Sequence, residues 1–381
     1  MTNPRTNARI TVVGAGFAGL TALRTVRASA PEAELTLVAP AAELHYLPGT
    51  IWLPSGKRTR EQLVVPLGNF LRRQRVRFHG ARAIGLSPDA RTLHTSAGDV
   101  ANDGLVIATG ARFGRGVAGL EHVIVPCEGI AAAEAIRERL AAIAQGTICF
   151  GFGSNPAEPV AMRGGPIFEF ALGIDALLRR QRRRDRFRLV FFSASERPGQ
   201  RLGQHAVDRL LREMRARGIE AILGEKPLRF EADAVQLERT RIASDMTLFM
   251  PGLTGAAWLD GASLPRSPGG FVEGDAGCRV AGVSRTYVAG DGGSYPGPEW
   301  LPKQAHQADL QATVAARNLV RELRGDAPDE TFRSELVCII DALDRGLLVT
   351  RGERGGFSLP PLRAMHWAKA AFERAYLRRY R

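Results

Sequence analysis

Length, composition and charge set the first limits. The chain has 381 residues, of which 45% are hydrophobic and 24% are charged, as in soluble globular proteins with two or three domains. Its formal net charge of +13 favours an anionic partner. No run of about 18 apolar residues is present, and residues 1–8 are polar, so neither a transmembrane helix nor a signal peptide is expected. The expected compartment is the reducing cytoplasm.

The four cysteines are Cys127, Cys149, Cys278 and Cys338. They are far apart and form no C-x-x-C pair, so neither a zinc knuckle nor a thioredoxin-type motif is expected, and no metal site is predicted. In a reducing compartment a disulfide between any of them would be catalytic or redox-sensing. Cys149 lies in an apolar segment and is expected to pack in the core.

A glycine motif follows the β-branched segment 10–13. Gly14, Gly16 and Gly19 have the spacing G-x-G-x-x-G, and apolar side chains then recur at helical spacing. Gly14 permits a tight turn, Gly16 lets a pyrophosphate approach the backbone, and Gly19 lets the helix pack against the strand. The helix N-terminus favours the phosphate charge. With a second strand at 35–38, the motif predicts a dinucleotide-binding βαβ unit.

One part of this unit is missing. The acidic residue that binds the ribose is expected about 20 residues further on. That position falls near Ala39 and Pro40, so the ribose must be held by the backbone or by Glu43.

Several short elements follow. Residues 43–52 are apolar and aromatic with a Pro-Gly break, which indicates a loop over a ligand or a partner element. Residues 60–73 are expected to form a helix. Short strands are expected at 76–78, 83–86 and 92–95. A buried strand at 105–107 then ends in Ala108-Thr109-Gly110, where the backbone can touch a cofactor.

The middle of the chain repeats the alternation of strand and helix. The predicted elements are a strand at 147–150, a helix at 168–184, a strand at 188–192, a helix at 205–217 and a strand at 221–223. This alternation indicates a second doubly wound domain. Prolines and glycines at 156–166 break the glycine motif after its first strand and delay the helix, which argues against a second nucleotide site.

A run of arginines, 179–184 with one glutamine, ends the helix predicted at 168–184. These cations either complement the dipole of the helix or contact an anionic surface. Nucleic acid is not expected as a partner, because the arginine clusters lack interleaved aromatic residues and no nucleic-acid-binding module is present.

Two further candidates lie in the last third of the chain. A strand at 286–288 leads to Gly290-Asp291 at a helix entrance, which places a carboxylate beside sugar-like hydroxyls. Lys303 precedes the helix expected at 305–320. It is either a cation near an electron-accepting ring or a surface lysine.

The chain ends with strands at 336–341 and 346–349 and a helix at 363–381. One narrow stripe of this helix contains Met365, Ala368, Phe372 and Tyr376, with most of its arginines opposite. The helix either docks on its own protein or on a dimer mate, or it lies as a basic amphipathic helix in a membrane interface.

Four motifs occur in the order seen in flavoproteins with two dinucleotide-binding domains: Gly14-x-Gly16-x-x-Gly19, Ala108-Thr109-Gly110, Ala289-Gly290-Asp291 and Pro302-Lys303. Within that superfamily the chain most resembles the sulfide:quinone oxidoreductases and flavocytochrome c sulfide dehydrogenases, which are FAD-dependent pyridine nucleotide-disulfide oxidoreductases. The narrower resemblance rests on the broken second motif, on Gly165-Pro166-x-x-Glu169 and on Cys338-Ile339-Ile340-Asp341.

The resemblance implies the fold and the cofactor. The expected fold is α/β, with two Rossmann-like dinucleotide-binding domains and a C-terminal platform that ends in an amphipathic helix. The expected domains are an FAD-binding domain at 1–112 and 275–325, a second domain at 113–274, and a membrane or dimer-interface region at 326–381. FAD would place its pyrophosphate on Gly14–Gly19, its ribityl chain near Asp291 and its ring near Lys303. Non-covalent FAD is expected, because segment 43–52 contains no cysteine.

The resemblance also implies sulfur chemistry with one part missing. In sulfide:quinone oxidoreductases two cysteines flank the flavin. Cys338 occupies one of these positions, whereas Ala161-Met162-Arg163 stands where the other is expected. Cys127 matches a third, more peripheral cysteine of the family. The candidate catalytic residues are therefore Cys338, Cys127 and Lys303.

The implied function is the transfer of two electrons from sulfide or a small thiol, through a cysteine and FAD, to a quinone or another acceptor. One alternative is a flavin quinone reductase that uses NAD(P)H or an organic thiol on the same fold. Another is a catalytically impaired flavin-binding sensor, or a binding protein recruited to a membrane. The expected partners include an anionic membrane surface, reached through 363–381, and a second copy in a homodimer. The protein is then either free in the cytoplasm or peripheral on the cytoplasmic face of the membrane.

Overall fold

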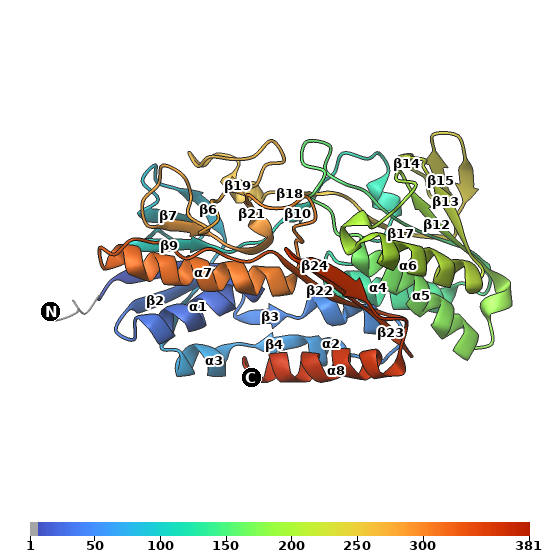
Figure 1. Ribbon diagram of the computed structural model, residues 1–381, viewed down its shortest axis with the longest axis horizontal. Helices are drawn as coiled ribbons and strands as arrows, with labels where there is room; N and C mark the ends of the chain where they lie inside the picture. The colour runs from blue at the N-terminus through green and yellow to red at the C-terminus, as the bar shows by residue number, and fades with distance from the viewer. Residues whose placement is uncertain (1–6) are drawn as a thin grey trace.

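The structure is a computed structural model that describes residues 7–381 (Figure 1). One half of the molecule contains a five-stranded parallel sheet with the strand order β20–β9–β1–β2–β5. The strands are β1 (Arg9–Val13), β2 (Glu34–Ala39), β5 (Val76–Gly80), β9 (Gly104–Ile107) and β20 (Thr286–Val288). Because Thr286 of β20 pairs with Leu105 of β9, a late segment of the chain completes the sheet that residues 9–107 begin. Helices α1 (Phe17–Ser29) and α7 (Ala305–Leu323) pack against each other and against this sheet.

A second parallel sheet lies in the other half of the molecule (Figure 1). Its strand order is β13–β12–β11–β17, and every pair is parallel. The strands are β11 (Gly146–Phe152), β12 (Phe187–Ser193), β13 (Ile219–Leu223) and β17 (Met246–Met250), and the helices of this half are α4 (Ile130–Ala142), α5 (Gly165–Arg180) and α6 (Gln204–Ala216). The predicted α/β class with two Rossmann-like sheets is therefore confirmed. The exact domain boundaries stay a prediction.

The C-terminal part is an antiparallel sheet followed by a helix. Strands β22 (Glu335–Asp341), β23 (Gly346–Gly352) and β24 (Gly355–Ser358) pair in this order. Helix α8 (Arg363–Arg378) then runs along one edge of the molecule, next to α2 (Arg60–Leu63) and β4 (Val64–Pro66) in the view of Figure 1. Among residues 7–381, no helix is both long and apolar enough to cross a membrane.

The remaining elements are short. They are β3 (Glu43–His45), α3 (Gly68–Arg73), β6 (Ala83–Leu86), β7 (Thr92–Thr95), β8 (Val100–Ala101), β10 (Arg112–Phe113), β14 (Pro227–Phe230), β15 (Ala234–Leu237), β16 (Arg241–Ala243), β18 (Leu253–Thr254), β19 (Val272–Glu273) and β21 (Gly293–Ser294), together with short 3-10 turns.

Two predicted segments differ from the structure. The helix expected at 60–73 is split, because the β-branched Val64-Val65 and then Pro66 do not continue a helix and instead form β4. Strand β4 pairs with β3, which occupies the start of the loop expected at 43–52. The rest of that segment is a 3-10 helix, Leu47–Trp52, whose Trp52 is buried.

The stripe predicted on the tail helix is also wrong. Tyr376 is buried against Phe17 and Tyr46, with ring centroids 5.4 and 5.9 Å apart, whereas Phe372 is 57% exposed. The helix turns its polar Lys369 and Glu373 inward, because both find buried partners of opposite charge. The exposed apolar stripe consists of Ala364, Trp367, Ala368, Ala371, Phe372 and Ala375.

Candidate active site

The predicted glycine motif forms the turn between β1 and α1. A Cβ on Gly14, whose φ is 110°, would lie 2.3 Å from the carbonyl oxygen of Ala108, and a Cβ on Gly19 would lie 1.9 Å from that of Gly14. At Gly16 a Cβ would meet no atom within 4 Å. Gly16 also caps α1 without a side-chain hydrogen bond, so the first N–H groups of the helix point to this open space. The close backbone contacts therefore require glycine at positions 14 and 19, whereas Gly16 borders space for a ligand.

The other motifs meet this turn at the carboxyl ends of the parallel strands. Ala108 donates its N–H to the carbonyl of Val13 at 2.9 Å. Gly290, with a φ of 77°, lies against helix α1, since a Cβ there would be 3.1 Å from the Cβ of Ala18. A Cβ on Gly292 would be 3.0 Å from the carbonyl oxygen of Gly110. In doubly wound sheets this edge is where dinucleotides bind.

Thr109 has a partner that sequence reasoning missed. Its hydroxyl lies 3.2 Å from the indole nitrogen of Trp258, which donates to it. The next residue, Gly110, has a φ of 67°, and a Cβ there would meet no atom within 4 Å. The backbone after Thr109 is therefore open, as it is at Gly16.

Asp291 and Lys303 are in contact. Lys303 donates from Nζ to the carbonyl oxygens of Asp291 at 3.1 Å and Gly293 at 2.7 Å. The same Nζ lies 3.9 Å from the ring centroid of Phe271. The Asp291 carboxylate pairs with Arg163. Lys303 is half-buried, and burial lowers its pKa to about 8, although Asp291 acts in the opposite direction. The alternative of an ordinary surface lysine is therefore not favoured.

The two candidate cysteines lie in one apolar cluster, that of the second sheet. Cys127 is buried in this cluster, and the half-buried Cys338 packs against it together with Met162. All four cysteines of the chain are free thiols. Burial raises the pKa of the Cys127 thiol to about 11, and that of the Cys338 thiol to about 12. Cys149 packs in the core as expected.

A buried ion pair lies beside Cys338. Lys369 of α8 donates from Nζ to the carboxylate of Glu169 and, at 3.0 Å, to the carbonyl oxygen of Ile339, the neighbour of Cys338. Burial opposes the charge of Lys369, but Glu169 and Cys338 outweigh it and raise the pKa of the lysine. After burial, Glu169 is the larger influence and raises the pKa of the Cys338 thiol, whereas the ammonium of Lys369 lowers it by less. Sequence reasoning missed this pair, whose two residues are 200 positions apart.

The second glycine motif does not form a tight turn. Strand β11 ends at Phe152, and α5 begins only at Gly165, where Pro166 is tolerated in the first turn. The loop 153–164 between them is fixed by hydrogen bonds. The Asn155 amide donates to the carbonyls of Leu253 and Gly269 at 3.0 and 3.1 Å, and Arg201 donates to that of Val160 at 2.6 Å. These contacts agree with the expectation that the motif is broken.

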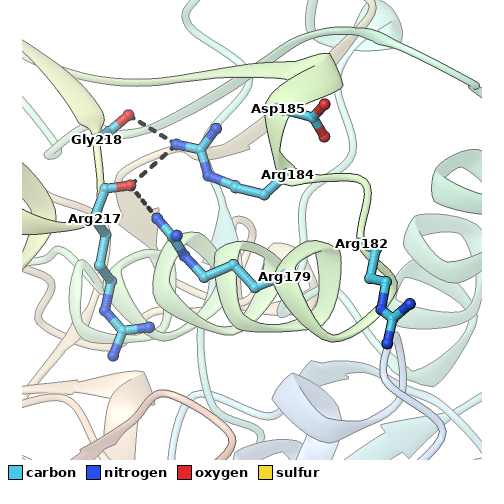
Figure 2. Close-up of a pocket in the computed structure, with 6 residues that line it drawn as sticks. All are labelled: Arg179, Arg182, Arg184, Asp185, Arg217 and Gly218. Atoms are coloured by element: carbon cyan, nitrogen blue, oxygen red, sulfur yellow. Dashed lines mark hydrogen bonds between the residues drawn. The ribbon is translucent and has the colours of Figure 1, made fainter.

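An arginine-lined hollow of about 730 Å³ opens at the far end of α5 (Figure 2). Figure 2 shows Arg179 and Arg184 both directed at the carbonyl of Arg217, at the end of α6, at 2.8 and 3.2 Å. Beneath them the fully buried Asp175 accepts ion pairs from the same two arginines and from Arg217, at 2.7–3.3 Å. The guanidinium groups of Arg179 and Arg184 thus close the C-terminal end of α6, a different helix from the one whose dipole they were predicted to complement. Arg179 also lies in the last turn of α5, where the predicted role places it.

The residues of the first sheet fit FAD. The open backbone at Gly16 and Gly110 leaves room for phosphate and sugar groups, the N-terminus of α1 faces them, and Asp291 and Lys303 lie on the same edge. Within residues 7–381 there is no group of three or more His, Cys, Asp or Glu side chains placed to hold a metal ion.

Comparisons with known proteins show the family of this chain. A family profile described as pyridine nucleotide-disulphide oxidoreductase matches residues 8–312. A sulfide-quinone reductase of Aquifex aeolicus (strain VF5) is 25% identical over 400 residues, which cover 97% of this chain and 90% of that protein.

Solved structures share the fold. The sulfide:quinone oxidoreductase from the hyperthermophilic bacterium Aquifex aeolicus matches with a TM-score of 0.90 at 22% identity, covering 98% of this chain and 91% of that one. NDH2 from Plasmodium falciparum, in complex with NADH, matches with a TM-score of 0.74 at 11% identity, covering 93% and 92%. This chain therefore belongs to the pyridine nucleotide-disulphide oxidoreductase family and is an FAD-dependent oxidoreductase that resembles the sulfide-quinone reductases.

Proposed function

We propose that the protein oxidises sulfide or another small sulfur compound and passes two electrons through non-covalently bound FAD to a quinone. The observation that carries this proposal is the position of Cys338, on β22, beside the Lys369–Glu169 ion pair and in the same apolar cluster as Cys127. A sulfur donor needs a thiolate partner, and an adjacent ammonium favours that charge. The Aquifex aeolicus relative, named a sulfide-quinone reductase, supports the substrate class.

Each part of the chain has a separate role in this proposal. Gly14–Gly19 and Ala108–Gly110 hold the FAD pyrophosphate, Gly290-Asp291 binds the ribityl chain, and Lys303 places a positive charge near the ring. FAD supplies the two-electron acceptor. Cys338 binds the sulfur donor, with Cys127 as the second thiol, while Lys369 stabilises the thiolate. Met162 lies where the family has its second flavin-flanking cysteine. The protein therefore either uses Cys127 as the second thiol or works with Cys338 alone.

The exposed apolar stripe of α8 supports a membrane quinone as the electron acceptor. Trp367 and Phe372 are 66% and 57% exposed, among alanines and flanking arginines. An aromatic and apolar stripe with basic neighbours suits the interface of an anionic membrane. Behind it, Phe372 contacts Tyr376, and Tyr376 contacts Phe17 of the glycine motif, at ring centroid distances of 5.9 and 5.4 Å. A membrane quinone would therefore approach from α8.

The main alternative is reduction by NAD(P)H. The long, pinned loop 153–164 takes the place of the tight turn that would bind a second pyrophosphate, which disfavours this alternative. Anaerobic rapid mixing of the purified protein with sulfide and, separately, with NADH tests it. We expect sulfide to bleach the flavin absorbance and NADH to leave it unchanged. Bleaching by NADH alone would contradict the proposal. A flavin that stays oxidised with every donor would favour the alternative of a catalytically impaired flavin-binding sensor.

A further inference from the structure

A second buried network joins α8 to β22. Asp341, whose side chain is fully buried, accepts a hydrogen bond at 2.6 Å from Nδ1 of His366. Its other oxygen accepts from the indole of Trp52 at 3.0 Å and from the backbone of Leu343 at 2.8 Å. On the far side of the imidazole, Lys57 Nζ lies 3.1 Å from Nε2 of His366 and also donates to the carbonyl of Leu343.

One tautomer of His366 satisfies both partners. A carboxylate only accepts and an ammonium only donates, so a proton on Nδ1 and a lone pair on Nε2 complete both contacts. The side chain of His366 is only 12% exposed, and its ring packs edge-on against Trp52 at 6.0 Å.

Asp341 and His366 lie on the same two elements as Cys338 and Lys369. Cys338 and Asp341 are three residues apart on β22, and His366 and Lys369 are three residues apart on α8. On a helix, residues at this spacing share a face, so His366 and Lys369 lie on one side of α8. On a strand they point to opposite faces, so it is the backbone of β22 that links Cys338 to Asp341. The Asp341–His366 bond therefore holds the same strand and the same helix together one step away from Cys338 and Lys369. Glu169 connects the two groups, because its Oε1 accepts both from Lys369 and, at 2.9 Å, from the backbone of Asp341.

We propose that Asp341 and His366 are positioning residues that hold Lys369 beside Cys338, and that Lys57 fixes the tautomer of His366 which this contact requires. The proposal rests on the role proposed above for Cys338. It predicts that loss of the Nδ1 bond lets Lys369 withdraw, so that the Cys338 thiolate loses its stabilising charge.

Two substitutions of similar size separate positioning from mere packing. In His366→Asn the amide nitrogen takes the place of Nδ1 and can still donate to Asp341. In His366→Gln the amide reaches the place of Nε2, and the bond to Asp341 is lost. Lys369→Met removes the charge directly and gives the reference effect. The matched control is His94→Asn, because His94 forms an exposed pair with Asp99 at 3.0 Å, far from β22 in the sequence.

The readout is the rate at which iodoacetamide alkylates Cys338 in the purified holoprotein at pH 8.5, assigned by peptide mass spectrometry. A rise of about one unit in the thiol pKa, partly offset by greater thiolate nucleophilicity, slows this rate about three- to tenfold. We expect that slowing for Lys369→Met and His366→Gln, and wild-type rates for His366→Asn and His94→Asn. The double variant His366→Gln/Lys369→Met should be no slower than Lys369→Met alone, since both changes remove one interaction.

Equal rates for His366→Asn and His366→Gln, faster alkylation of His366→Gln, or additive effects in the double variant would overturn the proposal. Faster alkylation would mean that the helix merely shields the thiol. The assay uses neither sulfide nor quinone. If the protein failed to oxidise sulfide while these rates behaved as expected, the proposed function would fail and the positioning role would stand.

Discussion

The carbonyl oxygen of Gly14 lies so close to Gly19 that a Cβ on Gly19 would be 1.9 Å from it, whereas a Cβ on Gly16 would meet no protein atom within 4 Å. Gly19→Ala should therefore prevent the turn from closing and destabilise the protein strongly. Gly16→Ala should fold normally but bind FAD at least about tenfold more weakly, which corresponds to about 1.4 kcal/mol. Thermal unfolding and flavin content after dialysis measure the two effects. Full flavin content in Gly16→Ala would place the pyrophosphate elsewhere.

The arginine-lined hollow makes a prediction about stability. Asp175 is fully buried and pairs with Arg179, Arg184 and Arg217. Asp175→Asn leaves these guanidinium groups without their shared anion, so we expect a loss of about 3 kcal/mol in the free energy of unfolding. Denaturant unfolding measures it, with the exposed Asp185→Asn as the control. A loss below about 1 kcal/mol, as for a surface pair, would contradict this account of the hollow.

The lowered pKa of Lys303 predicts that the reduction potential of the flavin depends on pH. Burial lowers the pKa of Lys303 to about 8, so the side chain is charged below that pH and becomes neutral above it. A charged lysine near the ring would stabilise the anionic reduced flavin. As the pH rises through and beyond about 8, this stabilisation is lost, and the potential should fall more steeply than the flavin's own protonation requires. Spectroelectrochemical titration of wild type and Lys303→Met measures it. The same slope in both proteins would place Lys303 away from the ring.

Membrane attachment is best tested on the surface of α8. Deletion of the tail would also remove Tyr376, Leu377 and Tyr380, which are buried in the hydrophobic core around the five-stranded sheet. Trp367→Ser/Phe372→Ser changes only exposed side chains, and should lower co-sedimentation with anionic vesicles about tenfold or more, because two large aromatic anchors are lost. Ile84→Ser is the control, since Ile84 is 61% exposed outside α8. An equal loss of co-sedimentation in the control, or no loss in the double variant, would contradict membrane attachment through α8.

The glycine turn was predictable from the sequence because its causes are local. Gly14, Gly16 and Gly19 follow directly on a β-branched strand, and the structure places them as expected. The split of the helix at 60–73 had a local cause as well, Val64-Val65-Pro66, but the pairing of this segment with β3 depends on residues 19 to 23 positions away.

The polar network around Cys338 was less predictable. Trp52 and Asp341 are 289 residues apart in the sequence, and Glu169 and Lys369 are 200 apart. No periodicity indicates such partners. The tail helix illustrates the difficulty, since Lys369 and Glu373 lie on its buried face and Trp367 on its exposed face. Charge pairing within the fold decided which side faces inward, against the hydrophobic pattern.

The most direct test of the sulfur chemistry is an anaerobic titration of the purified, flavin-loaded protein with sulfide, followed by flavin absorbance. We predict stoichiometric bleaching of the wild type, loss of bleaching in Cys338→Ala, and wild-type behaviour in Cys149→Ala, whose thiol is buried in the core of the second sheet. Bleaching of Cys338→Ala at the wild-type rate, or a protein that takes up no flavin at all, would contradict the account.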